Sequence, residues 1–175
     1  SKNLSKKLQN NCVNLLNIAR NNFHRDSVLS FITSPYLKNV QATWGQIIKN
    51  IGVQTGFAQW LNLLDIAIEK GNNQAANLKD FLINLESKVS ILEKSSSFNL
   101  LVSHAREIFK TFLDLENLTL PEQNLFATLE NILEEISSFD KVRYAQKGEF
   151  LEEFNYLVKQ KTVNTLCVYS FLILI

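Results

Sequence analysis

The chain has 175 residues, of which 46% are hydrophobic and 20% charged, and its net charge is +1. This composition excludes a disordered chain, allows a core of domain size, and argues against a protein that holds nucleic acid mainly by charge. Five glycines and two prolines are too few for an all-β fold rich in turns. Two cysteines, Cys12 and Cys167, are too few for a disulfide framework or a four-thiolate zinc site, so we expect a cytoplasmic protein.

Apolar residues recur at helical spacing along most of the chain. They predict an all-α domain of about eight helices over residues 1–161. The stripes place these helices in the first twenty-odd residues, at 27–33, at 39–50, between Gly56 and Gly71, and around 78–92, 101–115, 125–139 and 148–160.

Helix boundaries are marked by residues that suit helix ends. Asp26 is expected to cap the helix at 27–33, and Ser34-Pro35 to end it, because a residue before proline avoids the helical region. The serines at 95–97 offer a cap for the next helix. Thr119 and Pro121 restart the chain as a helix, since proline suits a first helical turn.

Residues 162–175 form an apolar tail that carries no charge after Lys161. The run 165–175, "TLCVYSFLILI", is shorter than the roughly 20 residues that span a membrane as a helix. We expect no membrane association for this tail. It is expected to be a short buried strand, the truncated beginning of a following domain, which makes the chain a fragment.

Few side chains could carry chemistry. His104 and Glu107 lie three residues apart, a spacing compatible with a metal, but a helical-bundle metal site needs several further inward carboxylates. His104 also falls on the apolar face of its helix, which favours a packed histidine. His24 is expected to lie at a helix start and Cys12 in the core. We therefore expect no catalytic residue, no metal ligand and no cofactor in this chain.

Basic residues near the start of the chain are candidates for contact with a DNA backbone. They are Lys6, Lys7, Arg20 and Arg25. An ordinary helix surface is the alternative interpretation. Asparagine is frequent and scattered, which we attribute to the base composition of the coding sequence.

Residues 34–64 predict a docking corner between helices. The stretch combines "SPYL" at 34–37 with "TWGQIIKNIGVQTGFAQWLNLL" at 43–64. Two glycines allow a tight turn between two tryptophan-bearing helices, and the proline stop is expected to place an aromatic residue and a leucine in a groove beside the first of them. The corner consists of Tyr36, Leu37, Trp44, Gly52, Gly56 and Trp60.

The order of these signals resembles a known family. The succession Arg25-Asp26-x-Val28, then Ser34-Pro35-Tyr36-Leu37, then Trp44 … Gly52-Val53-x-x-Gly56-x-x-x-Trp60 resembles the helical insertion of AddB-like proteins. These are PD-(D/E)XK nuclease proteins on a UvrD-like helicase framework, related to ATP-dependent helicase/exonuclease subunits. They act in DNA double-strand break repair and recombination.

The resemblance covers roughly residues 10–161. It implies a non-catalytic helical accessory domain that braces RecA-like and nuclease domains of the same protein or a partner subunit, and that contacts DNA weakly or through the whole protein. The tail at 162–175 would begin the strand of a RecA-like domain. The family's phosphate-binding loop and carboxylate–lysine nuclease cluster are not found in these residues, so no catalytic residue is carried over.

Two other functions remain open at this point. The chain could be a stand-alone helical protein–protein interaction module without a DNA role. It could also be a small helical enzyme that uses His104, although the partner residues for such a role are missing from the sequence.

Overall fold

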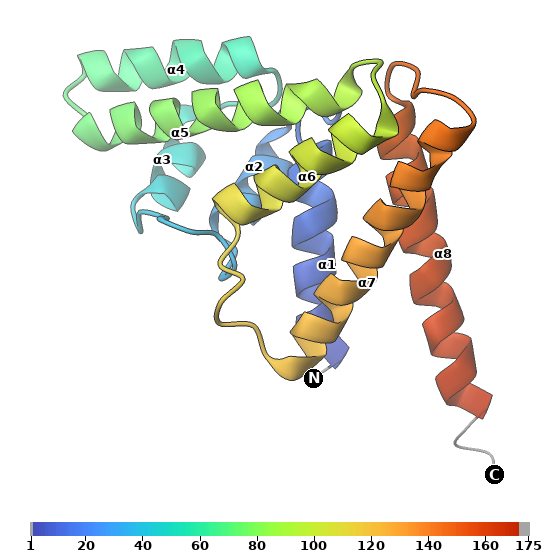
Figure 1. Ribbon diagram of the computed structural model, residues 1–175. Helices are drawn as coiled ribbons and strands as arrows, with labels where there is room; N and C mark the ends of the chain where they lie inside the picture. Colours follow the sequence, from blue (N-terminus) through green and yellow to red (C-terminus); the bar gives the residue numbers. More distant parts are fainter. Residues whose placement is uncertain (1, 172–175) are drawn as a thin grey trace.

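The computed structural model describes the backbone of residues 2–171 and the side chains of residues 6–161. Over this part of the chain the fold is all-α, as predicted, with eight α-helices and two short 3-10 helices (Figure 1). The elements are α1 (Lys2–Asn17), α2 (Arg25–Ile32), α3 (Trp44–Ile51), α4 (Phe57–Glu69), α5 (Asn73–Val89), η1 (Ser90–Glu93), α6 (Phe98–Phe112), α7 (Leu120–Ser137), η2 (Ser138–Lys141) and α8 (Glu149–Phe171).

The helices pack as two connected groups around one apolar core. Helices α4 and α5 lie along each other as a hairpin, with α3 against them (Figure 1). Helices α1, α7 and α8 pack together in the other group, and α6 contacts both α5 and α7. The largest fully buried side chains include Trp60, Phe31, Phe98, Phe109 and Phe150. These residues come from both groups, so a single core joins them.

Two of the predicted helix starts have the expected caps. The Ser97 side chain accepts a hydrogen bond from the Leu100 backbone N–H at the start of α6. At the start of α7, Thr119 and Glu122 form a capping box, in which the Glu122 side chain accepts a hydrogen bond from the Thr119 backbone N–H. Both caps satisfy backbone N–H groups that the helix itself leaves unpaired.

The cap of α2 and the start of α3 differ from the prediction. His24, not Asp26, is the N-cap of α2, and its Nδ1 accepts a bond of 3.3 Å from the Asp26 backbone N–H. Asp26 lies in the first turn, where its charge suits the positive end of the helix. Helix α3 begins at Trp44 rather than near residue 39, because Asn39 adopts a left-handed conformation with φ of 57°.

The predicted C-terminal strand is wrong for the part of the tail that the structure describes. Helix α8 continues without interruption through residues 162–171 and ends at Phe171. Residues 172–175 lie outside the described part. A single strand would leave its backbone groups unpaired without a neighbouring strand, whereas a helix satisfies them within its own segment. Within residues 2–171 the structure contains isolated β-bridges, Leu37 with Leu113 and Ser96 with Ala145, and no strand.

Candidate functional site

The docking corner joins two loops that are distant in sequence. Tyr36 and Leu37 are each 7% exposed. The Lys38 backbone N–H donates to the Phe112 carbonyl oxygen at 2.9 Å, and the Asp114 N–H donates to the Tyr36 carbonyl oxygen at 2.7 Å. The backbone partners of this segment therefore lie at the end of α6 and in the connection that leads to α7, a region that the sequence did not single out.

A buried carboxylate completes this junction. The Tyr36 hydroxyl donates a hydrogen bond of 2.5 Å to Oε1 of Glu122, which is 4% exposed. Oε2 of Glu122 accepts from the Thr119 backbone N–H at 2.8 Å and from the Thr119 hydroxyl at 2.7 Å. Burial, followed by the bond to Glu122, raises the pKa of Tyr36 to about 12. The bonds from Tyr36 and then Thr119 lower the pKa of the Glu122 carboxyl.

The two tryptophans of the corner are both buried but have different partners. Trp60 is fully buried, and its Nε1–H donates to the Phe23 carbonyl oxygen at 2.7 Å. Trp44 is 4% exposed and packs on Phe81, with ring centroids 5.0 Å apart. Its Nε1 is buried and has no hydrogen-bond partner among the described residues.

Gly52 and Gly56 form the turn between the two tryptophan-bearing helices. Their φ angles are 72° and 95°, in the left-handed region that glycine adopts at little cost. Gly52 ends α3 and Gly56 precedes α4. Both positions therefore need glycine for the reason that the sequence suggested.

The four candidate DNA contacts do not form one free basic surface. Lys6 and Lys7 are exposed on α1. Arg20 instead binds the start of α8: its Nη2 contacts Glu152 in the helix at 3.0 Å, and its Nη1 donates to the carbonyl oxygen of Gly148, just before the helix, at 3.0 Å. Arg25 is half-buried and its Nε is buried without a partner among the described side chains. Arg20 thus joins the connection between α1 and α2 to the start of α8.

The residues considered for catalysis lie apart or in the core. His104 is half-buried on α6, Cys12 is buried, and burial raises the pKa of the Cys12 thiol. His24 accepts the cap bond at α2. Among residues 6–161, no three His, Cys, Asp or Glu side chains gather as a group that could hold a metal ion. The side chain of Cys167 lies outside the described residues.

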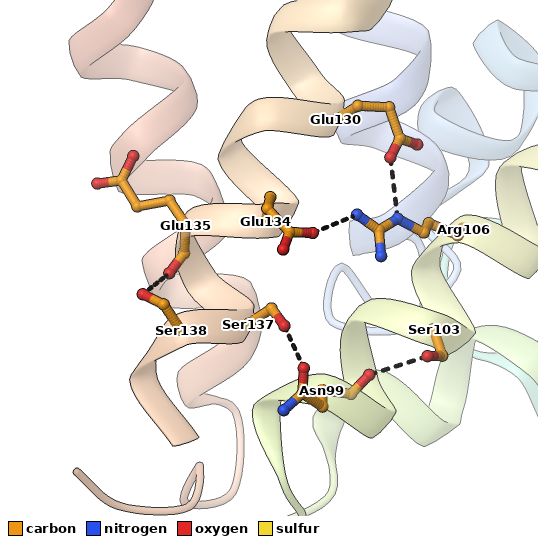
Figure 2. Close-up of polar contacts among 8 residues, drawn as sticks. All are labelled: Asn99, Ser103, Arg106, Glu130, Glu134, Glu135, Ser137 and Ser138. Carbon is orange, nitrogen blue, oxygen red and sulfur yellow. Dashed lines mark hydrogen bonds and ion pairs between the residues drawn. The ribbon is translucent and has the colours of Figure 1, made fainter. Parts of the chain in front are cut away.

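Near His104, the polar contacts instead hold α6 against α7. Nε of Arg106 binds Glu130 at 2.9 Å and its Nη2 binds Glu134 at 3.1 Å, while the Ser137 hydroxyl bonds the Asn99 side chain (Figure 2). The bond to Glu130, followed by the bond to Glu134, raises the pKa of Arg106. These contacts therefore join α6 to α7.

A groove between α1 and α8, about 530 Å³ in volume, is the feature that the sequence analysis missed. Its lining is rich in side-chain amides: Gln9, Asn10, Asn14, Asn17, Asn21 and Asn155. The signal was present, because four of these asparagines follow one another at intervals of four, three and four residues, which places them on one side of a helix.

One amide pair fixes the contact between the two helices that form this groove. Asn17 and Asn155 exchange two hydrogen bonds, each 2.8 Å between the amide nitrogen of one and the amide oxygen of the other. The Asn17 amide nitrogen also donates to the Val13 carbonyl oxygen at 2.8 Å. Asn17 is 5% exposed, so its side of this pair is shielded from water.

No protein-family model, curated protein or solved structure matches the chain. The likeness to AddB-like proteins therefore remains a resemblance of short residue patterns. Among the described residues, no helix combines the length and apolar character that crossing a membrane requires.

Proposed function

We propose that the chain is a rigid, non-catalytic helical segment of an AddB-like helicase–nuclease protein that acts in DNA double-strand break repair and recombination. In this role it braces neighbouring RecA-like and nuclease domains and contacts DNA. The observation that carries the proposal is the docking corner. Tyr36 and Leu37 are buried, and the backbone around them is hydrogen-bonded to residues 112–114.

A brace must keep its shape when its neighbours move. The corner supports this role because it connects the loop after α2 with the loop after α6 through backbone bonds and through the buried Tyr36–Glu122 contact. Packed interiors deform little and transmit strain. A corner of this kind lets one helical group hold the position of the other.

Rigidity at the corner can be measured by hydrogen exchange. We expect the backbone amides of Lys38 and Asp114, which donate across the junction, to exchange only on global unfolding. The amide of the exposed neighbour Asn39 is the control for fast exchange. Exchange of Lys38 and Asp114 at the rate of Asn39 would contradict a rigid brace.

The DNA contact in this proposal is weak. Arg20 already binds Glu152, so the exposed cations that remain from the candidate set are chiefly Lys6 and Lys7. Each phosphate contact contributes about −0.9 to the slope of log affinity against log salt. Two lysines therefore predict a slope of about −2 for binding to a duplex end.

Fluorescence anisotropy with a labelled blunt duplex tests the DNA contact over a range of salt concentrations. The variant Lys6→Gln with Lys7→Gln is expected to remove the slope. The matched control is Lys49→Gln with Lys70→Gln, which has the same net charge. It changes two exposed lysines, of which Lys49 lies on α3 and Lys70 directly follows α4. Flat curves for the unaltered chain at low salt would remove DNA from the function.

A stand-alone protein–protein interaction module is the second candidate function. The amide-lined groove between α1 and α8 favours it, because side-chain amides there have hydrogen-bonding groups that the described residues do not use.

A further inference from the structure

The connection between α1 and α2 has a backbone conformation that its residues do not favour by themselves. Asn22 and Phe23 have φ angles of 53° and 49°, in the left-handed region. Asparagine enters this region fairly often, but a bulky side chain such as that of Phe23 is an outlier there, because its Cβ crowds the backbone. Contacts from outside the connection must therefore hold Phe23 in this conformation.

The turn before α4 supplies backbone contacts on both sides of Phe23. The Gly56 N–H donates to the Asn22 carbonyl oxygen at 2.7 Å. In the opposite direction, the Arg25 N–H donates to the Gln54 carbonyl oxygen at 2.8 Å. These bonds join the connection between α1 and α2 to a segment about thirty residues further along the chain.

Helix α4 holds Phe23 itself. The Trp60 Nε1–H donates to the Phe23 carbonyl oxygen at 2.7 Å, and this bond is buried. The Phe57 ring packs against the Phe23 ring, with centroids 5.0 Å apart. Because Phe57 and Trp60 both belong to α4, the conformation of the connection depends on where this helix lies.

Helix α4 is also the helix with the smallest share of buried residues among α2 to α7. Two of its 13 residues, Trp60 and Leu64, are buried, whereas seven of the 15 residues of α6 are. It lies along α5 at the edge of the molecule (Figure 1). Elements with few buried contacts open at a lower free energy than the core does.

We infer that residues 54–60 are a releasable clamp on the joint between α1 and α2. With the clamp closed, the left-handed connection is fixed, and with it the angle between the two helices. When α4 separates from α5, the bonds to Asn22, Phe23 and Arg25 are lost together and the connection relaxes. This conformational device goes beyond the proposed function: the docking corner after α2 stays rigid, while the joint before α2 opens.

Native-state hydrogen exchange of the full chain tests the clamp. The reporters are the amides of Arg25 and Gly56, which donate across the joint in opposite directions. We expect both amides to share one opening equilibrium and to open at least about tenfold more often than the amides of Lys38 and Asp114. Their exchange should also depend less on added urea, because a local opening exposes less surface than global unfolding does.

Two variants separate local opening from global unfolding. Trp60→Phe removes the donor to Phe23 and should speed exchange of both reporter amides about 5- to 150-fold. Tyr36→Phe breaks the bond to Glu122, which lies outside the clamp. It should speed exchange of the Lys38 amide, which requires global unfolding, and leave the reporter amides unchanged.

The inference is overturned if Tyr36→Phe speeds the reporter amides as much as the Lys38 amide, because the joint would then open only on global unfolding. It is also overturned if Arg25 and Gly56 show different opening equilibria, or if Trp60→Phe leaves their exchange unchanged. The unaltered chain and Tyr36→Phe decide the question even if Trp60→Phe does not fold.

Discussion

The Tyr36 hydroxyl and the Glu122 carboxylate are 86 residues apart in sequence and are joined by a hydrogen bond of 2.5 Å in the core. The same carboxylate closes the capping box of α7 through Thr119. One buried charge therefore holds both a helix start and the docking corner. Because it is satisfied by three donors, its burial is compatible with a stable fold.

Removal of the Tyr36 hydroxyl should destabilise the protein. Tyr36→Phe leaves Oε1 of Glu122 without this donor in a buried site, and we expect a loss of about 1–3 kcal/mol in the free energy of unfolding. Urea denaturation measures the loss. Tyr156→Phe is the control, because Tyr156 is 58% exposed and its change should be close to neutral. Equal stabilities for the two variants would show that the Tyr36–Glu122 bond contributes nothing.

The stability of the protein should fall with acidification partly through Glu122. Bonds from Tyr36 and Thr119 lower its pKa in the folded state below the unfolded value. Its contribution is therefore complete above the unfolded-state pKa and is lost as the pH falls through the folded-state pKa. Urea midpoints of the unaltered chain and of Glu122→Gln, measured from neutral to acidic pH, should converge as the pH falls. Parallel curves would be inconsistent with this role.

The two tryptophans of the corner should respond differently to phenylalanine. Trp60→Phe removes the donor to the buried Phe23 carbonyl oxygen, whereas Trp44→Phe removes an Nε1–H that has no described partner. Both changes leave a similar space in the core. We expect Trp60→Phe to cost about 1–3 kcal/mol more than Trp44→Phe, because only the first leaves a buried acceptor unpaired. Thermal or urea unfolding of both variants gives the difference, and a larger loss at Trp44 would reject the argument.

Alanine should have opposite effects at two glycines of this region. Gly52 has a φ of 72°, so Gly52→Ala is expected to cost about 1–2 kcal/mol even though no atom lies near the added methyl group. Gly45 lies inside α3, and a Cβ there would meet the Thr33 methyl at an ordinary 3.5 Å. Gly45→Ala should therefore stabilise the chain by about 0.5–1 kcal/mol. Melting temperatures that move in the same direction would contradict this backbone argument.

Local features of the sequence predicted much of the helical architecture. The apolar stripes indicated each helix, and Ser97 and Thr119 marked helix starts correctly. Errors occurred where local signals competed. Asp26 and His24 are both polar residues near a helix start, and the pattern alone did not show which one caps it. The apolar tail contains no glycine, proline or charged residue that would mark a boundary, so its composition did not distinguish a helix from a strand.

The candidate site was less predictable than the fold. The sequence drew attention to Arg20 as a cation but not to Glu152, which lies 132 residues further along and binds it. It also drew attention to Tyr36 without indicating that its partner would be Glu122. The amide groove needs both α1 and α8, and within the described lining α8 contributes Asn155 to its amides.

The sequence by itself determined where residues 2–161 are mostly helical, which helix faces are apolar and where glycine must turn the backbone, because periodicity, capping and φ preferences act over a few residues. Only the tertiary structure decided that Tyr36 meets Glu122, that Arg20 is held by α8 and that the asparagines of α1 border a groove. These contacts depend on how the helices pack against one another. Packing is set by the whole core and is not encoded in any single segment.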